Sequence, residues 1–338
     1  MAGMGPGVDR IRRFKLTGTG AYLPRTVVDS DDLDRTHGRE AGTSRRQFGI
    51  DRRHYAAPDE TSTMMAVVAA EEALDDAGRA PDQLDAIIGA CGVMEQPIPG
   101  TAPMVQAWLG LGGSGIPAYD INATCLSFVP ALETALAGMA MQGWQRVLIF
   151  ASDIASAALD HEDPEASAIF GDGAAAVIVE AGEAHALLAS RIETYGDHVN
   201  LCRLDAGGTR LRPHEDLAGF LAASRFRMDG PALFRATARR FPAFLSRLLE
   251  RAGITPADIG TVIPHQASAP ALEHLRRALN IPADRVVDLF ASLGNRIASS
   301  MPHALHVARR DGRLGPGTCS LLVGSSAGIS LGGAVIRW

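Results

Sequence analysis

In two long stretches of the chain, apolar residues recur at the spacing that is typical of an α-helix. Residues 64–77 form an alanine-rich stretch that ends at Gly78, and residues 234–252 form a second that ends at Gly253. Glycine is the commonest residue just beyond a helix because it adopts a left-handed backbone without strain. Thr61 and Ser62 precede the first stretch and are candidate N-caps. The pattern therefore predicts two helices, each with a defined end.

Short, continuous apolar runs lie between the helical stretches. Residues 86–90 and 147–151 are apolar throughout, which is typical of strands that are buried on both faces of a largely parallel sheet. Alternating helices and strands of this kind predict an α/β fold. Residues 201–227, rich in Gly, Arg and Pro, have no clear period. We expect a loop or lid there.

The pattern occurs twice along the chain. Three segments of the first half have counterparts in the second half, in the same order, which predicts a duplicated architecture. We place the join near residues 180–186 and expect two α/β halves, residues 1–183 and 184–338. The paired segments are 77–88 with 252–263, 147–152 with 321–325, and 176–178 with 334–336.

Composition excludes several classes of protein. Of the 338 residues 46% are hydrophobic and 21% are charged, and the net charge of −6 comes without a basic cluster, so we expect no nucleic-acid partner. No apolar run reaches 18 residues, so we expect no membrane span. Residues 1–13 lack the apolar core of a secretory signal. Four widely spaced cysteines fit no metal-binding pattern, so we expect a reduced, cytoplasmic protein without a metal.

Cys125 is the first candidate for chemistry. It follows a strand-like run and precedes an apolar stretch to Met141 that is typical of a buried helix. The positive end of a helix and its free N–H groups lower the pKa of a thiol and can hold an oxyanion. We therefore predict a nucleophilic thiol with a lowered pKa. A packed core cysteine is the alternative.

His265 and Asn295 are two further candidates. His265 follows the end of a predicted strand, where the sites of α/β proteins usually gather, although a structural histidine fits the same pattern. Asn295 lies at a turn that enters a helix, where most asparagines are helix caps. In the duplicated scheme, Asn295 falls close to the position of Cys125. A twofold relation would bring both turns to one central place.

These residues resemble the Cys-His-Asn triad of β-ketoacyl-acyl carrier protein synthase III. Cys125, the segment Pro264-His265-Gln266-Ala267 and the pair Gly294-Asn295 stand in the order and context of that triad. Further segments are similar to the opening strand and turn of the family, to its F-G-D-G-A-G-A segment, to its M-x-G-x-x-V-F segment and to its last strand. They are residues 18–24, 170–175, 228–234 and 332–337.

The resemblance implies a thiolase fold in a five-layer αβαβα arrangement, a homodimer and acyl transfer in two steps. Cys125 would take an acyl group from acyl-CoA or an acyl carrier protein, and no cofactor would be needed. His265 and Asn295 would hold a malonyl-type thioester during its decarboxylation, and the enolate would attack the acyl group. The backbone amides of Cys125 and Ala327 would form the oxyanion hole.

The chain departs from the family pattern at two places. A run of glycines in the family reads Gly324-Ser325-Ser326-Ala327-Gly328 here, so the pocket shape differs. The family's R-T-G-I segment reads Gln47-Phe48-Gly49-Ile50, and Thr43 stands where a tryptophan would stack on coenzyme A. The second departure weakens the case for coenzyme A and leaves a carrier-protein donor open, and the two together favour a dedicated pathway over primary fatty-acid synthesis.

Other residues are candidates for substrate contacts. Arg45, Arg46, Arg52 and Arg53 would meet a phosphate or an acidic carrier, or simply form a solvated basic loop. Glu95 falls in the segment that relatives send into the partner's acyl pocket; a surface carboxylate is the alternative. The expected substrate-binding residues are Arg46, Phe48, Arg52, Glu95, Phe226 and Ser268.

Decarboxylating condensation is the leading hypothesis, because Asn295 is best explained by a second thioester that must be held. Within the same fold, the alternatives are acyl transfer to an alcohol or amine and condensation without decarboxylation. A thioester hydrolase of unrelated fold and a catalytically silent partner subunit are alternatives of other kinds. The duplication argues against the hydrolase, and retention of all three residues argues against the silent subunit.

Overall fold

The computed structural model describes residues 12–338, so most of the segment interpreted above as lacking a secretory signal lies outside the described residues. The strands are β1 (Arg12–Tyr22), β2 (Thr26–Asp29), β3 (Arg52–Tyr55), β4 (Ala86–Gly89), β5 (Ala118–Asp120), β6 (Arg146–Asp153), β7 (Gly173–Thr194), β8 (Cys202–Arg203), β9 (Arg227–Met228), β10 (Ile259–Pro264), β11 (Cys319–Ser326) and β12 (Ser330–Arg337). The α-helices are α1 (Ser30–Thr36), α2 (Thr43–Phe48), α3 (Ser62–Ala77), α4 (Thr101–Trp108), α5 (Phe128–Gln142), α6 (Pro164–Ser167), α7 (Leu217–Ala223), α8 (Gly230–Ala252), α9 (Ala269–Leu279), α10 (Phe290–Leu293) and α11 (Ser300–Arg310).

Both predicted helices are confirmed. The Thr61 hydroxyl accepts a hydrogen bond from the Met64 N–H at the start of α3, and Gly78 ends that helix at φ +63°. Helix α8 begins at Gly230, earlier than predicted, because the Asp229 carboxylate accepts from the Ala232 N–H and caps it. No helix within residues 12–338 is long and apolar enough to cross a membrane.

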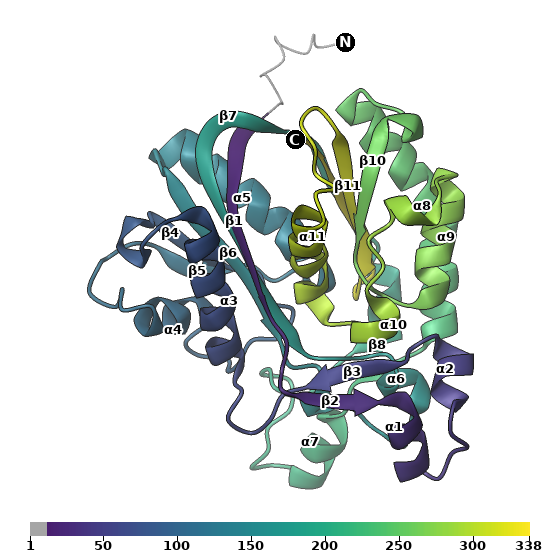
Figure 1. Cartoon of the computed structure of the whole chain (residues 1–338). Helices are drawn as coiled ribbons and strands as arrows, with labels where there is room; N and C mark the ends of the chain where they lie inside the picture. Colours follow the sequence, from purple (N-terminus) through teal and green to yellow (C-terminus); the bar gives the residue numbers. More distant parts are fainter. Residues whose placement is uncertain (1–11) are drawn as a thin grey trace, which may run out of the picture.

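The strands form a mixed sheet in the order β10-β11-β12-β7-β6-β4-β5, with β1 paired to β7 (Figure 1). Successive residues of a strand point to opposite faces, and here both faces are covered. Ile87 packs with α3 and α4, whereas Ile88 packs with the central helices α5 and α11. On the other half, Val262 packs under α8 and α9, whereas Ile263 faces the same central helices. Helices α5 and α11 thus lie between the two halves of the sheet, and the outer faces are covered by α3 and α4 on one half and by α8 and α9 on the other. The result is five layers, with α5 and α11 in the middle.

The repeat predicted from the sequence is visible in the element order. Helix α3, a short 3-10 turn and β4 follow one another in the first half, as do α8, a 3-10 turn and β10 in the second. Strand β6 corresponds to β11, and the start of β7 corresponds to β12. The predicted join at residues 180–186 lies inside β7, which runs without interruption from Gly173 to Thr194. The division into two domains stays a prediction.

The segment 201–227 is more ordered than expected. It contains β8, α7 and the first residue of β9, and β8 pairs with β9 through Cys202 and Met228. The prediction of a loop was therefore wrong in part. Its short elements escaped notice because two-residue strands carry no readable period.

Candidate active site

Cys125 lies in a 3-10 turn, η2 (Thr124–Leu126), directly before α5. Thr124 has a left-handed backbone, φ +51°, and two side chains fix the turn around it. The Asn122 Oδ1 accepts from the Thr124 N–H at 2.8 Å, and the Ser127 Oγ accepts from the Ala123 N–H at 2.9 Å. These bonds hold the half-buried thiol at the junction between the sheet and the central helix.

The electrostatics of Cys125 differ from the prediction. Burial raises the pKa of the Cys125 thiol above its ordinary value, and the neighbouring Cys202 and Asp153 act in the same direction. The backbone N–H groups of Cys125 and Ala327 lower the thiol pKa, but less than burial raises it. The expected lowered pKa was therefore wrong. The same two amides are the pair expected to form the oxyanion hole, and both lie against the sulfur.

His265 directly follows β10 and is almost completely buried. Its backbone N–H donates to the Val323 carbonyl of β11 at 2.9 Å, and its ring Nδ1 has no hydrogen-bond partner among residues 12–338. Burial lowers the pKa of His265 to about 4, so the imidazole is neutral near pH 7. The adjacent Gln266, also buried, donates to the Pro264 and Val287 carbonyls and accepts from the Leu289 N–H. The hydrogen bonds of the Gln266 side chain thus fix the backbone next to His265.

Asn295 is held by both its backbone and its amide. The Asn295 N–H donates to the Ile169 carbonyl at 2.7 Å, and the Gly171 N–H donates to the Asn295 carbonyl at 3.1 Å. The side-chain Oδ1 accepts from the Ile297 N–H at 3.0 Å, and Nδ2 donates to the Ala267 carbonyl at 3.3 Å. Because Ala267 lies two residues beyond His265, the Asn295 amide lies beside the His265 segment.

Gly294 explains why a glycine precedes Asn295. It has φ +69°, and an added Cβ would lie 2.7 Å from the Ile169 carbonyl oxygen. Any other residue would push Asn295 away from the segment around Phe170 and Gly171. The F-G-D-G segment noticed in the sequence is therefore the support of the Asn295 backbone.

The two halves repeat this turn. Asn295, Ile297 and Ser300 make the hydrogen bonds that Asn122, Thr124 and Ser127 make in the first half, and Ile297 has φ +48°. The residue equivalent to Asn295 is thus Asn122 and not Cys125, three residues away. The second 3-10 turn, η7 (Ile297–Ser299), contacts η2, which also contacts β11. The structure therefore brings the turns of Cys125 and Asn295 together, and the backbone N–H of His265, at the end of β10, bonds to the adjacent strand β11.

Comparison with known proteins gives the family. The family model for 3-oxoacyl-[acyl-carrier-protein (ACP)] synthase III matches residues 119–196, and that for its C-terminal part matches residues 249–338. The beta-ketoacyl-[acyl-carrier-protein] synthase III of Paracoccus denitrificans is 34% identical over 334 residues, covering 97% of this chain and 100% of that protein. The chain belongs to the β-ketoacyl-acyl carrier protein synthase III family.

Solved structures of the synthase III family show the same fold. The 3-oxoacyl-[acyl-carrier-protein] synthase III of Aquifex aeolicus is 33% identical, with a TM-score of 0.87 over 96% of this chain and 100% of that one. The priming beta-ketosynthase from the R1128 polyketide biosynthetic pathway is 26% identical, with a TM-score of 0.84 over 99% of each chain. The expected thiolase fold is thereby confirmed.

The arginines expected to meet a phosphate are placed unequally. Arg53 is fully buried, and its guanidinium donates to the Ala168 carbonyl at 2.6 Å, so its prediction as a phosphate contact was wrong. Arg45 pairs with Asp51 at 2.6 Å. Arg45, Arg46 and Arg52 are exposed on the surface, and Arg46 pairs with Glu40 at 3.6 Å. These three arginines stay predicted contacts for a phosphate or an acidic carrier.

The remaining expected substrate contacts are mostly engaged in local structure. The Glu95 carboxylate accepts from the Thr63 N–H at 2.6 Å, at the start of α3. Ser268 caps α9 by accepting from the Ala271 N–H at 3.3 Å. Phe48 is partly buried against the small core cluster that contains Ile50. Their roles in substrate binding stay predictions.

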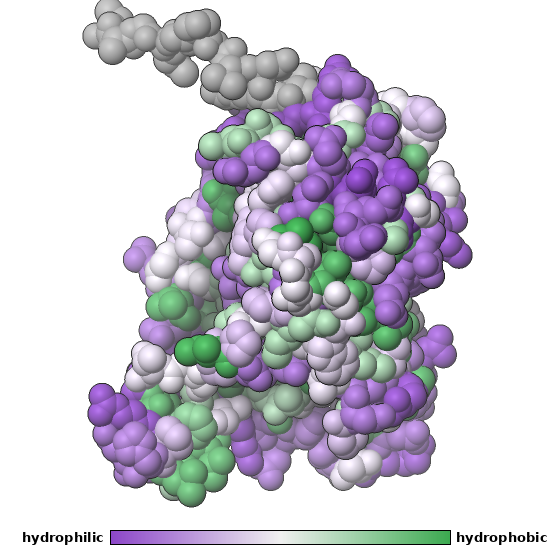
Figure 2. All heavy atoms as spheres, turned by 90° about the vertical axis from the view of Figure 1, so that its left-hand side faces the viewer, coloured by the Kyte–Doolittle hydropathy of each residue, from purple (hydrophilic) through white to green (hydrophobic). Residues whose placement is uncertain are grey.

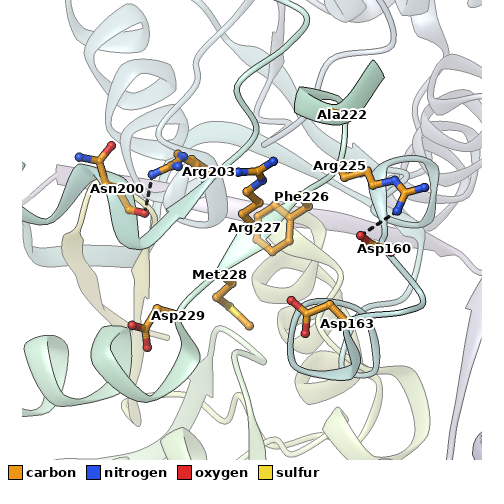
Figure 3. Close-up of a pocket in the computed structure, with 10 residues that line it drawn as sticks. All are labelled: Asp160, Asp163, Asn200, Arg203, Ala222, Arg225, Phe226, Arg227, Met228 and Asp229. Carbon is orange, nitrogen blue, oxygen red and sulfur yellow. Dashed lines mark hydrogen bonds and ion pairs between the residues drawn. The ribbon is translucent and has the colours of Figure 1, made fainter. Parts of the chain in front are cut away.

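Phe226 lines an open cavity of about 320 Å³ between the 160–163 segment and β9 (Figure 3). Its ring meets that of Phe170 edge-on at 5.1 Å, and Phe170 lies beside Asn295. The cavity is polar. Its charged and amide lining residues are Asp160, Asp163, Asn200, Arg203, Arg225, Arg227 and Asp229.

A smaller space of about 50 Å³ reaches His265 from the side of α8 and α9, with Phe234, Phe241 and Leu272 in its apolar lining. Sequence reasoning missed two residues of the site, Gln266 and Asp153. Asp153 left a readable signal: it is a lone carboxylate at the end of the apolar run of β6. Gln266 left none beyond its place next to His265.

Proposed function

We propose that this synthase III chain condenses acyl thioesters, with Cys125 as the acyl carrier and His265 and Asn295 as the holders of a malonyl-type acceptor. The observation that carries the proposal is the convergence of η2, η7 and the end of β10, which places a thiol, a neutral imidazole and an amide in one buried region. Such a set suits thioester chemistry because it combines a nucleophile with two hydrogen-bond donors.

The first step is transfer of the acyl group. The Cys125 sulfur bonds to the acyl carbon of the donor thioester, and the donor's thiol leaves with the proton of Cys125. A tetrahedral oxyanion forms on the way. The N–H groups of Cys125 and Ala327, which already lie against the sulfur, are suited to stabilise that charge.

The second step is decarboxylation and condensation. A malonyl thioester binds with its carbonyl oxygen accepting hydrogen bonds from the His265 ring and the Asn295 amide. CO₂ leaves, and the electron pair it leaves behind forms an enolate on that oxygen. The enolate carbon then bonds to the acyl carbon, and the Cys125 thiolate is released. Burial supports the donor role of His265, because it keeps the ring neutral near pH 7.

The proposed donors are acyl-CoA or an acyl carrier protein, and the proposal needs no cofactor. Arg46 and Arg52 are exposed on α2 and β3 and could bind a phosphate or an acidic carrier surface. The chain lacks the tryptophan and arginine that the resemblance places at the coenzyme A site, which favours the carrier.

A homodimer is part of the proposal. Within residues 12–338, strand β5 pairs only with β4 and forms an edge of the sheet, and such an edge is a template for pairing with another chain. The face around β5 and α4 shows scattered hydrophobic side chains (Figure 2), and Ile98, Trp108 and Tyr119 are exposed near that edge. Light scattering should give about twice the monomer mass of 35.6 kDa. A single 35.6 kDa species would exclude the dimer.

The acyl-carrier role is tested by intact mass. The purified protein, incubated with a panel of acyl-CoA and acyl-carrier thioesters, should gain the mass of one acyl group. The Cys125→Ala protein should gain none. The Cys202→Ala protein is the matched control, because Cys202 is the neighbouring thiol and should leave labelling intact.

Adding a malonyl thioester then separates the candidate reactions. Release of CO₂ with a β-ketoacyl product supports condensation. Transfer to an added alcohol or amine without CO₂ release would establish the alternative acyltransferase. Equal labelling of wild type and Cys125→Ala would show that the nucleophile is wrong, and no labelling at all would support the silent-subunit hypothesis.

A further inference from the structure

Asp153 is a buried carboxylate that none of the steps above uses. It is the last residue of β6 and has no exposed surface. Its Oδ1 accepts from the N–H groups of Gly92 and Val93, both at 2.8 Å, and its Oδ2 accepts from the Ser299 N–H at 3.1 Å. It makes no ion pair with any described residue. A buried anion without a cation is costly, so these three bonds mark a position under strong constraint.

The three donors come from segments that border the catalytic turns. Ser299 is the last residue of η7, the turn that Asn295 enters. The Asn122 amide donates to the Gly92 carbonyl at 3.2 Å, and Ser127 donates to the Cys91 carbonyl at 3.3 Å, so the 91–93 segment is tied to the turn of Cys125. Asp153 thus links the two turns through one side chain.

Gly92 shows how closely these parts are packed. A Cβ added there would lie 2.4 Å from the Ile297 Cγ2 and 3.4 Å from both the Thr124 carbonyl carbon and the Asp153 Oδ1. Gly92 therefore fills the gap between η2 and η7. The two turns and the Asp153 carboxylate thus lie within a few ångströms of one another around Gly92.

We propose that Asp153 is a positioning residue for the condensation: it holds η7, and with it Asn295, at the correct distance from the turn of Cys125. The inference rests on the proposed function, since Asn295 matters only if a second thioester is held. Asp153 touches neither substrate, and its loss acts through the placement of Asn295. Loss of Asp153 should therefore impair decarboxylation of the malonyl thioester more than it impairs the reactivity of Cys125.

The negative charge of Asp153 also acts on Cys125. There its effect is unfavourable, because it makes the thiol harder to ionise. Burial raises the pKa of the Asp153 carboxyl to about 7, against the pull of the backbone N–H groups that it accepts from. The titratable groups beside it are Cys91 and Cys125, and its negative charge raises the pKa of both thiols. Removing the charge should therefore make the Cys125 thiol easier to ionise.

Asp153→Asn tests the inference. An amide offers one acceptor oxygen where the carboxylate offers two, so it can satisfy the 92–93 side or Ser299 but not both. We expect CO₂ release from the malonyl thioester to fall about tenfold, the usual effect of losing a charge-assisted hydrogen bond. Alkylation of Cys125 by iodoacetamide at pH 8, above the pKa of about 7 at which Asp153 loses its proton, should stay equal or become faster.

Asp85→Asn is the matched control. Asp85 accepts from the N–H groups of Gln145 and Arg146 at 2.7 and 2.8 Å, at the opposite end of the same strand. Both N–H groups bind the same carboxylate oxygen, so an amide oxygen can accept from both, and this variant should leave both half-reactions close to wild type. If Asp153→Asn releases CO₂ within about twofold of wild type, or if alkylation and CO₂ release fall in parallel, Asp153 is merely structural. If the wild type itself releases no CO₂, the proposed function fails, and the inference with it.

Discussion

At the scale of single residues, burial governs the chemistry of this site more than local sequence does. His265 is the clearest case. In the unfolded chain this ring takes up a proton when the pH falls below its ordinary pKa of 6.5. In the folded chain it does so only when the pH falls below about 4, because burial lowers its pKa. Acid therefore favours the unfolded chain: the stability present above pH 6.5 is progressively lost as the pH falls to 4.

Replacing His265 should remove part of this acid sensitivity. We expect the free energy of unfolding of the wild type to drop by about 3 kcal/mol more than that of His265→Gln between pH 7 and pH 4. Urea denaturation at several pH values measures the difference. Equal pH slopes for the two proteins would show that the ring is not buried as described. The equally buried His303 remains in both proteins and contributes equally.

Individual residues also show where sequence reasoning ends. Cys125, His265 and Asn295 were predicted because their places at strand and helix boundaries agree with the duplication and with the triad of the synthase III family. The raised pKa of Cys125, the burial of Arg53 and the bonds of Asp153 were not predicted. Each depends on groups far away in the chain, Cys202, Ala168 and Ser299 respectively, and no local sequence pattern predicts these contacts.

At the scale of elements, the glycines of β1 allow α3 to pack directly on the strand. A Cβ on Gly20 would lie 2.1 Å from the Ala69 carbonyl oxygen and 2.7 Å from the Ala73 nitrogen, both backbone atoms of α3. Backbone cannot move aside cheaply, so Gly20→Ala should destabilise the protein by about 3 kcal/mol.

Thermal or urea unfolding measures the effect of Gly20→Ala. Gly113→Ala is the control, since an added Cβ there meets nothing within 4 Å, and it should change stability by less than about 0.5 kcal/mol. A Gly20→Ala protein as stable as the control would mean that α3 lies farther from β1 than described. The opening Gly-Thr-Gly of the sequence is thus a packing feature, although it was first noticed as a family resemblance.

Among the elements, length decided what could be predicted. Helices α3 and α8 were found with their caps, because many residues share one period and Thr61, Gly78 and Gly253 mark the ends. Segment 201–227 was taken for a loop, and β8, α7 and β9 within it are all too short to show a period. Their pairing is tertiary, through Cys202 and Met228.

At the scale of the whole molecule, the duplication was the most informative signal. Three short echoes in the same order predicted two α/β halves that meet at a common centre, and the structure places α5 and α11 there. The twofold relation also explains why the turns of Cys125 and Asn295 make equivalent sets of hydrogen bonds. The repeated segments could not show which single residues are equivalent. The hydrogen bonds of the two turns show that Asn295 corresponds to Asn122.

Strand β7 has a consequence for how the protein is made. Strand β1 is synthesised first, but its partner is β7, with Gly18 opposite Ile178, and the Arg309 guanidinium of α11 binds the Thr17 carbonyl. The first strand of the chain therefore emerges from the ribosome long before anything can pair with it. Contacts this distant in sequence make folding slow and leave hydrophobic surface exposed meanwhile. The pairing of β1 can therefore be completed only after β7 has been translated, and its contact with α11 only near the end of synthesis.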